Sequence, residues 1–329
     1  MILLLKTFSE AKGISGTEED VRKIIEKALS DDSSILTKTD KIGNLYAKKF
    51  ENDSYPNIVL FVPMDEPGFI ITDITNDGYL KFDAIGDLMP KNIISKRVKF
   101  NDTYGIISFK AVHLSTKEER KIKIKFSDLY IDIGANSKES AKRYISVGDT
   151  AVFDTEFSEF GDGLYKGKAL PARAYCDMAI KLIKNCNDIN LAVVFTVQSE
   201  ISYRGMCVAA NEAKDMDIAV ILSPYEVSES TKIKSGAVIG FCDSTDVLDE
   251  EYRKKLIEYA EKNKVKIQTA YKKDDGRRNI KRYVPNIPIL SIGLPVNYKK
   301  SPYNVIAKED IDYLSKILYN IGRFAEIEK

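Results

Sequence analysis

The chain has 329 residues, and its 44% hydrophobic content is enough for a folded protein of about two domains. Its 50 basic and 49 acidic residues nearly cancel, which argues against a nucleic-acid partner or an anionic membrane surface. The apolar run at residues 2–5 is too short for a signal-peptide core, and no stretch reaches the ~20 apolar residues of a membrane span. We therefore expect a cytoplasmic protein that does not enter the membrane.

The first part of the chain predicts a helix and then a buried strand. Thr17 and Asp20 form a capping signal, and apolar residues then recur with helical spacing over residues 21–29. The almost wholly apolar run at 57–62 is typical of a strand that is buried on both faces of a sheet covered by helices.

Between residues 68 and 160 the pattern changes to short alternating segments separated by turn signals. Asp77-Gly78 is such a signal, and it separates the segments 69–74 and 79–82, which predicts a β-hairpin. We expect this stretch to form a separate β-rich insert.

The rest of the chain returns to helices that alternate with apolar strands. The expected elements are a helix after Arg173, a strand at 191–197, a helix near 206–213, a strand at 218–222, a charged helix at 248–264, strands at 265–270 and 287–292, and a closing helix from 308 to 326. The simplest architecture is one α/β domain, a helix-covered mixed sheet of residues 1–67 and 161–329, interrupted by the β-rich insert 68–160.

Cysteine and histidine usage limits the chemistry available. The four cysteines, Cys176, Cys186, Cys207 and Cys242, are widely spaced and form no Cys-x-x-Cys pair, so we expect reduced core residues. His113 is the only histidine, and neutral imidazole is the commonest protein ligand for zinc. A conventional zinc site is therefore difficult to build from this chain.

Polar clusters follow the predicted strands at the place where α/β proteins bind their ligands. In such sheets, ligands bind beyond the carboxyl ends of the strands. The clusters occupy residues 63–66, 198–200, 223–225 and 298–302, and a fifth, at 168–173, opens a helix. Carboxylates in such places cap structure about as often as they serve chemistry, so the pattern alone does not decide between the two.

Six separated motifs carry a family resemblance that spans the chain. They are MDEPGF at 64–69, DLYIDIGA at 128–135, GKAL at 167–170, FTVQ at 195–198, RG at 204–205 and SP at 301–302. In this order they resemble the tetrahedral (TET-type), or glutamyl, aminopeptidases, some of which are labelled endoglucanase or cellulase M. The resemblance implies a zinc-peptidase-like α/β domain with a two-metal site and an inserted β-rich dimerisation domain.

The resemblance also implies that most metal ligands are lost. The family has a histidine where this chain has Pro63, a bridging aspartate at Pro171, and a glutamate general base at Ser199. An aspartate ligand is replaced by Ser223, and a second histidine is replaced by Lys300.

Glu200 is the single family ligand that remains, together with Asp65, which in the family supports the first histidine. Two close divalent cations need about four or more anionic or imidazole donors. A serine hydroxyl at 199 is also too weak a base to activate water. We therefore expect no metal, no cofactor and no catalytic residue, only a vestigial site of Asp65, Ser199 and Glu200. The candidate binding residues are Asp65, Glu66, Arg173, Glu200, Ser223 and Lys300.

Three functional hypotheses remain open at this point. The first is a non-catalytic pseudoenzyme, kept as an assembly subunit or as a pocket for a peptide or small ligand. The second is a divergent metallo-aminopeptidase that removes N-terminal residues, with one weak metal at Asp65 and Glu200 or with none. The third and least favoured is glycoside hydrolysis by the same two carboxylates.

The partners and the charges of the site lead to further predictions. The full-length insert predicts a homo-oligomer, at least a dimer, and the resemblance extends this to a tetrahedral shell or co-assembly with an active relative. Loss of two cations would leave Glu200 and Asp65 unpaired, so Lys300, helped by Arg173, is predicted to form a salt bridge to one of them; the alternative is that Lys300 points into solvent.

Three polar segments have simpler interpretations. His113 is expected to be a structural residue, the run 117–125 a solvated loop, and residues 274–278 an exposed turn.

Overall fold

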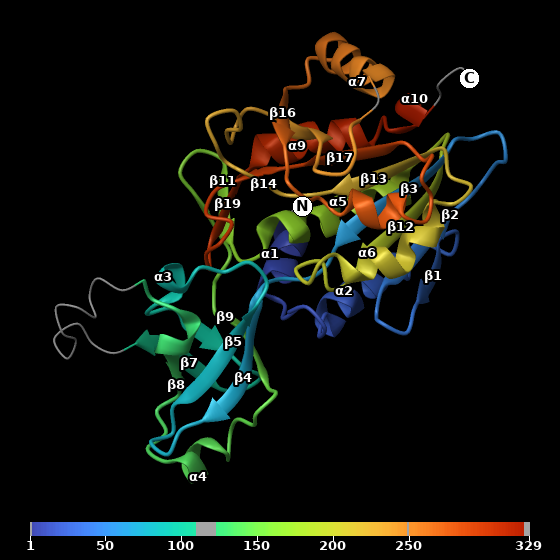
Figure 1. Ribbon diagram of the computed structural model, residues 1–329. Coiled ribbons are helices and arrows are strands. Elements are labelled where there is room, and N and C mark those ends of the chain that lie inside the picture. The colour runs from blue at the N-terminus through green and yellow to red at the C-terminus, as the bar shows by residue number, and fades with distance from the viewer. Residues whose placement is uncertain (1, 110–122, 249, 326–329) are drawn as a thin grey trace.

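A computed structural model describes residues 2–109, 123–248 and 250–325 of the chain (Figure 1). Within these residues the main domain is built on an eight-stranded mixed sheet, with strand order β1-β2-β12-β3-β13-β17-β15-β16. The strands are β1 (Leu36–Thr39), β2 (Leu45–Lys49), β3 (Asn57–Pro63), β12 (Asn190–Thr196), β13 (Ile218–Leu222), β15 (Ala237–Cys242), β16 (Ile267–Tyr271) and β17 (Ile289–Gly293). The central strands β12, β3, β13 and β17 run parallel, so their carboxyl ends meet at one edge of the sheet.

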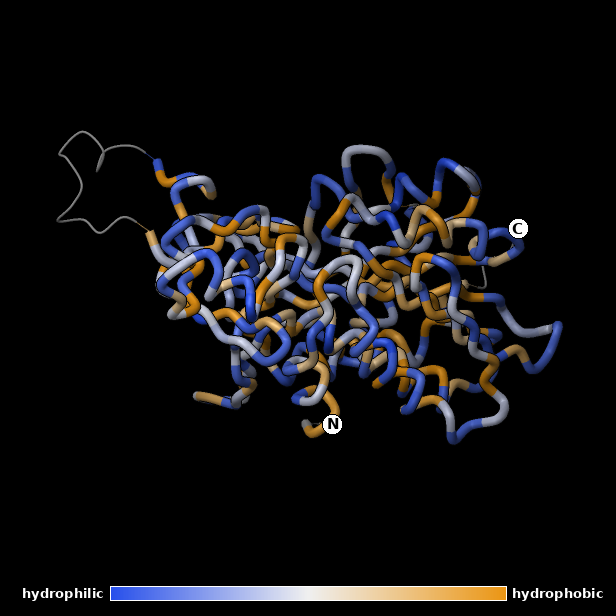
Figure 2. The backbone as a smooth tube through the Cα atoms, turned by 90° about the horizontal axis from the view of Figure 1, so that it is seen from below, coloured by the Kyte–Doolittle hydropathy of each residue, from blue (hydrophilic) through white to orange (hydrophobic). Residues whose placement is uncertain are grey.

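Helices cover both faces of this sheet, which confirms the predicted fold class. They are α1 (Ile2–Glu10), α2 (Glu19–Leu29), α5 (Leu170–Asn185), α6 (Arg204–Ala209), α7 (Glu250–Lys262), α8 (Arg277–Lys281), α9 (Lys308–Leu318) and α10 (Gly322–Ala325), with a short 3-10 helix at Ala210–Ala213. Hydrophobic segments run through the interior of the molecule, and several of the projecting loops are hydrophilic (Figure 2).

Side chains alternate along β3 between two hydrophobic layers, as burial on both faces requires. Ile58, Leu60 and Val62 pack in a large core with α1, α2, α5 and α9. Val59 and Phe61 pack on the opposite face with α6 and α8. This alternation is why the run reads as continuously apolar in the sequence.

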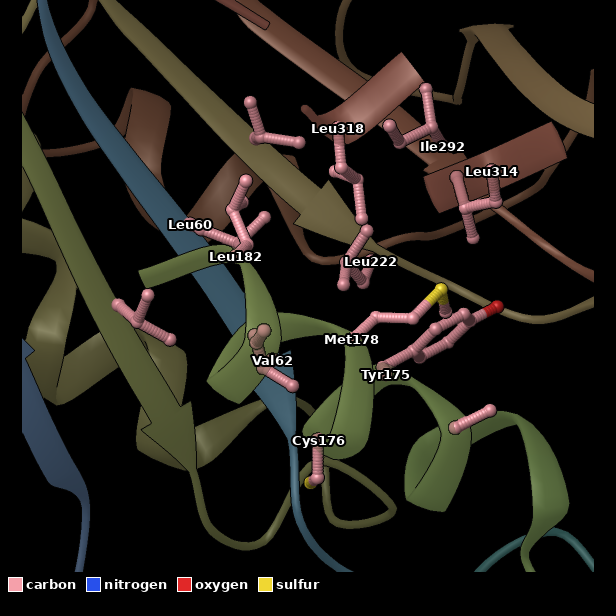
Figure 3. Close-up of a cluster of buried hydrophobic side chains, with 14 of the residues drawn as sticks. Leu60, Val62, Tyr175, Cys176, Met178, Leu182, Leu222, Ile292, Leu314 and Leu318 are labelled. Atoms are coloured by element: carbon pink, nitrogen blue, oxygen red, sulfur yellow. The ribbon is translucent and has the colours of Figure 1, made fainter. Parts of the chain in front are cut away.

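The larger core consists of strand and helix residues that lie together in Figure 3. Met178 and Leu182 of α5 belong to the same cluster as Leu60 and Val62 of β3. Complete burial of one such aliphatic side chain stabilises the fold by about 1.5–3 kcal/mol. This packing holds β3 rigidly, and β3 carries the first part of the site at its carboxyl end.

A closed barrel forms a second lobe beside the main domain (Figure 1). Its strands, in barrel order, are β4 (Gly68–Ile74), β5 (Leu80–Ile85), β8 (Leu129–Asp132), β7 (Tyr104–Phe109), β6 (Arg97–Lys99) and β9 (Thr150–Phe153). Short helices accompany it at α3 (Pro90–Ile93), Phe126–Asp128 and α4 (Lys138–Ala141). Phe69 packs edge-to-face on Phe82 and Phe153, each at 5.1 Å between ring centroids. The predicted hairpin around Asp77-Gly78 is confirmed as β4 and β5.

Two small sheets complete the part of the chain that the structure describes. One has the order β10 (Ser158–Phe160), β11 (Leu164–Gly167) and β19 (Asn304–Ala307), and the other pairs β14 (Tyr225–Glu226) with β18 (Pro295–Val296). We retain the division into residues 1–67 with 161–329 and residues 68–160 as a proposal. Within the proposed insert, β10 pairs outside the barrel.

One helix start differs from the sequence prediction, and a second lies inside the cluster 168–173 that was predicted to open a helix. The capping signal at Thr17 is wrong, because the Thr17 hydroxyl donates to the carbonyl of Ile14 and α2 begins at Glu19. The preceding Glu18 carboxylate instead accepts backbone N–H groups of Gly16 and Gln198, each at 2.8 Å.

Helix α5 begins at Leu170, before Arg173, with a proline in its first turn. Proline suits that position because the first N–H groups of a helix have no partner within the helix.

Two further observations concern burial. None of the described helices combines the length and the hydrophobicity of a bilayer-spanning segment. Cys176 and Cys186 are free and buried as predicted, whereas Cys207 and Cys242 are free but partly exposed. The prediction that all four are core residues is therefore wrong for the last two.

Candidate functional site

A cavity of about 430 Å³ lies where the loops after β3, β12, β13 and β16 meet. Pairing of Thr196 with Pro63 brings the ends of β12 and β3 to the same level. The vestigial residues Asp65, Ser199 and Glu200 line this cavity, and Ser223 lines it with them. The strand-end rule therefore brought these predicted residues together.

Asp65 connects two of the loops and is buried. Its Oδ2 accepts hydrogen bonds from the Ser15 hydroxyl at 2.5 Å and from the backbone N–H of Glu200 at 2.8 Å. Its Oδ1 is buried and has no hydrogen-bond partner among the described residues. Asp65 therefore fixes the start of the Glu200 loop against the end of β3.

Glu200 lies against the barrel lobe. Burial, and then the negative charge of Asp65, raise the pKa of its carboxyl group. Its Oε2 accepts the backbone N–H of Asp87 at 3.4 Å. Gly86 has a φ of +93°, and a Cβ there would lie 3.0 Å from Glu200 Oε2, so glycine permits this close approach.

Glu66 and Arg173, two predicted binding residues, belong to a buried ionic cluster with Lys168. Glu66 Oε1 accepts from Lys168 Nζ at 2.7 Å, from Arg173 Nη2 at 3.0 Å and from the backbone N–H of Gly13 at 2.9 Å. Arg173 also donates to the carbonyl of Met64. Burial lowers the pKa of Lys168 to about 8. Arg173 is fully buried and pairs with Glu66, so the predicted help to Asp65 or Glu200 is wrong.

The predicted salt bridge of Lys300 to Glu200 or Asp65 is also wrong. Lys300 Nζ pairs with Asp87 Oδ2 at 2.9 Å, with about a third of its side chain exposed. The hydrogen bond to Asp87 raises the pKa of Lys300. The carbonyl of Lys300 accepts Asn92 Nδ2 at 3.3 Å, so this loop is held toward the barrel rather than into the cavity.

Lys272 is the cation that the sequence reasoning missed. It follows β16 directly, lines the cavity, and its Nζ donates a hydrogen bond to the Ser223 hydroxyl. The same ammonium lies 5.6 Å from the ring centroid of Tyr225. Burial, and then the positive charge of Lys299, lower the pKa of Lys272 to about 7. The strand-end rule applied to the predicted strand 265–270 could have found it.

The segment 274–278, predicted as an exposed turn, is partly buried. Arg277 and Asp275 are fully buried, and Arg277 Nη2 lies 2.8 Å from Asp275 Oδ2. This ion pair lowers the pKa of Asp275 against the opposing effect of burial. Asp274 and Arg278 pair at 3.1 Å and line the cavity. His113 and residues 117–122 of the predicted loop lie outside the described residues.

The donor set does not fit a two-metal centre. Within residues 2–109, 123–248 and 250–325, no group of three or more His, Cys, Asp or Glu side chains could hold a metal ion. The Ser223 hydroxyl accepts a hydrogen bond from the amine of Lys272. The positive charges of Lys299 and Lys272 both favour the ionised form of Glu200 and lie near it. Ammonium groups repel divalent cations, whereas a two-metal site needs anionic donors.

A helix-covered mixed sheet, with its cavity at the carboxyl ends of parallel strands and a closed barrel beside it, defines a mixed α/β protein. A family model described as M42 glutamyl aminopeptidase matches residues 43–317. A protein of Acetivibrio thermocellus with a provisional aminopeptidase assignment is 33% identical over 328 residues, which cover 97% of each chain. This chain therefore belongs to the M42 glutamyl aminopeptidase family.

Solved structures share the fold along almost the whole chain. The TET1 peptidase of Pyrococcus horikoshii is 28% identical, with a TM-score of 0.87 over 98% of both chains, and that peptidase can assemble into a tetrahedron or a large octahedral shell. A TET aminopeptidase from a marine-sediment Thaumarchaeota archaeon is 24% identical, with a TM-score of 0.91 over 98% of this chain and 96% of that one. The resemblance to TET-type aminopeptidases is confirmed.

Proposed function

We propose that this member of the M42 family no longer performs metal-dependent hydrolysis and serves as a cytoplasmic, homo-oligomeric subunit that binds a peptide or small ligand. One observation carries the proposal: the amine of Lys272 donates a hydrogen bond to the hydroxyl of Ser223 in the cavity that Glu200 also lines. The Ser223 hydroxyl is engaged by this amine and Lys299 adds a positive charge near Glu200, so this part of the cavity offers few anionic donors to a divalent cation.

The proton chemistry of hydrolysis supports the same conclusion. The resemblance implies that the family's general base is a glutamate at the position of Ser199. Here Ser199 has a hydroxyl instead, which lies 3.3 Å from the hydroxyl of Thr196. A neutral hydroxyl does not take a proton from water at neutral pH. This site therefore lacks both the residues that would bind the metals and the residue that would act as general base in the family mechanism.

Metal analysis tests the proposal directly. Protein purified in buffer with zinc and cobalt should carry far less than one metal ion per chain by inductively coupled plasma spectrometry. It should also fail to turn over aminoacyl anilides under those conditions. Near-stoichiometric metal that is lost in the Glu200→Gln variant would contradict the proposal.

A second candidate, a divergent aminopeptidase with a single weak metal, has one observation in its favour. Asp65 and Glu200 are close, because Asp65 Oδ2 accepts the backbone N–H of Glu200 and its charge raises the pKa of the Glu200 carboxyl group. Turnover of aminoacyl anilides that disappears in Glu200→Gln would favour this candidate. Turnover that survives the substitution would indicate a contaminant.

The assembly part of the proposal rests on the family. A Pyrococcus horikoshii relative forms closed shells, and the β-rich barrel that the resemblance assigns to dimerisation is complete enough to close here. We expect at least a dimer, and co-assembly with an active relative is an extension of this proposal. A monomer mass by light scattering at micromolar concentration would rule out the homo-oligomer.

A further inference from the structure

Lys272 differs from the other amines around the site in what surrounds it. Its Nζ donates a hydrogen bond to the hydroxyl of Ser223. Among the described residues, no carboxylate lies within ion-pair distance of this Nζ. By contrast, Lys300 and Lys168 each have a carboxylate partner, at 2.9 Å and 2.7 Å. Lys272 also lines a neighbouring cavity of about 400 Å³, so its side chain contributes to the walls of two cavities.

We propose that the Lys272 amine is a nucleophile that captures a small 2-oxo acid as a reversible imine. The proposal goes beyond the proposed function by naming the chemistry of the ligand. It rests on that function in one respect, since the space beside Ser223 must be free of metal.

The reactivity follows from the surroundings of the nitrogen. A lysine reacts with carbonyl carbon only as the neutral amine, and desolvation beside a second cation is a known way to keep lysine neutral. Burial and the charge of Lys299 lower the pKa of Lys272 to about 7. Asp275, Glu200 and Asp274 act in the opposite direction and are outweighed.

The carboxylate of the ligand is assigned to the remaining positive charges. Lys299 and Lys273 line both cavities together with Lys272, and the side chain of Lys299 has no carboxylate partner within the described chain. A 2-oxo acid places a carboxylate one bond from its reactive carbonyl. The same molecule can therefore meet the Lys272 amine and the charge of Lys299.

The reaction balances without any further reagent. Lys272 Nζ attacks the carbonyl carbon and forms a C–N bond, while the carbonyl electron pair moves to oxygen. The Ser223 hydroxyl, bonded to the same nitrogen, is placed to relay a proton from nitrogen to that oxygen. Loss of the second nitrogen proton and of the hydroxyl group as water leaves the C=N bond. Nothing is oxidised or reduced.

Reductive trapping tests the inference on the full-length protein. Pyruvate is the probe, sodium borohydride reduces any imine to a stable amine, and peptide mass mapping locates the adduct. At pH 7.5 we expect Lys272 to carry at least about ten times more adduct than the adjacent, exposed Lys273, because burial lowers the pKa of Lys272 to about 7 and its amine lies beside the Ser223 hydroxyl in the cavity. Equal labelling of the two lysines would overturn the inference.

Variants sharpen the test. Lys272→Met should abolish the specific adduct, while the matched variant Lys273→Met should keep it. Lys299→Met should reduce labelling by pyruvate more than labelling by methyl pyruvate, which lacks the carboxylate. If both probes fall equally or not at all, the assignment of the carboxylate to Lys299 is wrong.

Metal analysis of the same preparation separates this inference from the proposed function. Stoichiometric metal without an adduct would reject both. A metal-free protein without an adduct at Lys272 would reject only the imine chemistry and leave the proposed function standing.

Discussion

Two groups of charged residues lie at the same edge of the main sheet, and they differ in how their charges are partnered. In the cluster of Glu66, Lys168 and Arg173, one carboxylate is surrounded by donors and every charge is ion-paired, with the Nε of Arg173 the one buried polar atom of the three side chains that lacks a hydrogen-bond partner among the described residues. In the cavity, Lys272 has a hydroxyl for a partner and Glu200 has a single long backbone hydrogen bond. Satisfied buried charges hold a fold together, whereas unsatisfied ones beside a cavity are available for a ligand.

Removing the carboxylate at the centre of the satisfied cluster should have the largest effect. Glu66→Gln leaves the buried charges of Lys168 and Arg173 without their counter-ion, and breaking such a pair costs about 3–5 kcal/mol of stability. Urea unfolding followed by circular dichroism measures the change. A loss below about 1 kcal/mol, which is typical of an exposed pair, would show that this cluster is no more structural than the cavity.

The second-largest effect should be the pH dependence of the stability that Lys272 contributes. In the folded chain the pKa of Lys272 is lowered to about 7. A lysine in the unfolded chain has a pKa of about 10.4. Between these two pKa values the unfolded chain binds more protons than the folded chain, so stability rises with pH. The contribution of Lys272 is at most about 1.4 kcal/mol per pH unit. Unfolding of wild type and Lys272→Met between pH 7 and 10 should show a smaller rise in the variant, and equal slopes would contradict this.

The close contact between barrel and cavity leads to a third prediction. Gly86→Ala places a methyl group 3.0 Å from Glu200 Oε2 and 2.9 Å from Pro67, at a φ of +93°. We expect a loss of about 1–3 kcal/mol in thermal unfolding, from backbone strain and from the contact together. Gly148→Ala is the matched control, because Gly148 has a φ of +96° and open space around it. The same loss in both variants would mean that the contact with Glu200 has no energetic importance.

Glu200→Gln should have the smallest effect and the opposite sign to Glu66→Gln. Burial and Asp65 raise the pKa of Glu200, so its ionised form is less favourable in the folded chain than in the unfolded chain. The folded state therefore loses stability as the pH rises through that raised pKa, and the amide avoids this loss. We expect stability at pH 7.5 to stay the same or increase by up to about 1 kcal/mol. A clear destabilisation would place Glu200 among the structural charges.

The order of elements and most of the site could be predicted because periodicity and strand ends are local signals. Asp65, Glu200 and Ser223 were found because each follows an apolar run that forms a central strand. The partner of Lys300 could not be predicted, because the direction of its loop depends on a hydrogen bond to Asn92 in the barrel lobe.

Burial of polar residues was the least predictable property. Asp275 and Arg277 lie in a sequence that is rich in charges, and such sequences are usually exposed. Here Arg277 also donates to the carbonyl of Gly240 on β15 at 3.1 Å, a contact across the fold that no local pattern shows. The predicted cap at Thr17 is wrong for a similar reason. The carboxylate of Glu18, just before the helix, accepts a hydrogen bond from the backbone N–H of Gln198, which lies far along the chain.

The pairing of β3 with β12 has a consequence for how the chain folds. The hydrogen bond between Asn57 and Asn190 at the start of this pairing joins residues 133 positions apart, and contacts of such separation form slowly. The first and last strands of the barrel are themselves paired, Phe69 with Ala151. A barrel that closes early therefore holds the two ends of the interrupted sheet together and shortens the loop that remains to be closed. A barrel that formed first would in this way aid the folding of the sheet that carries the site.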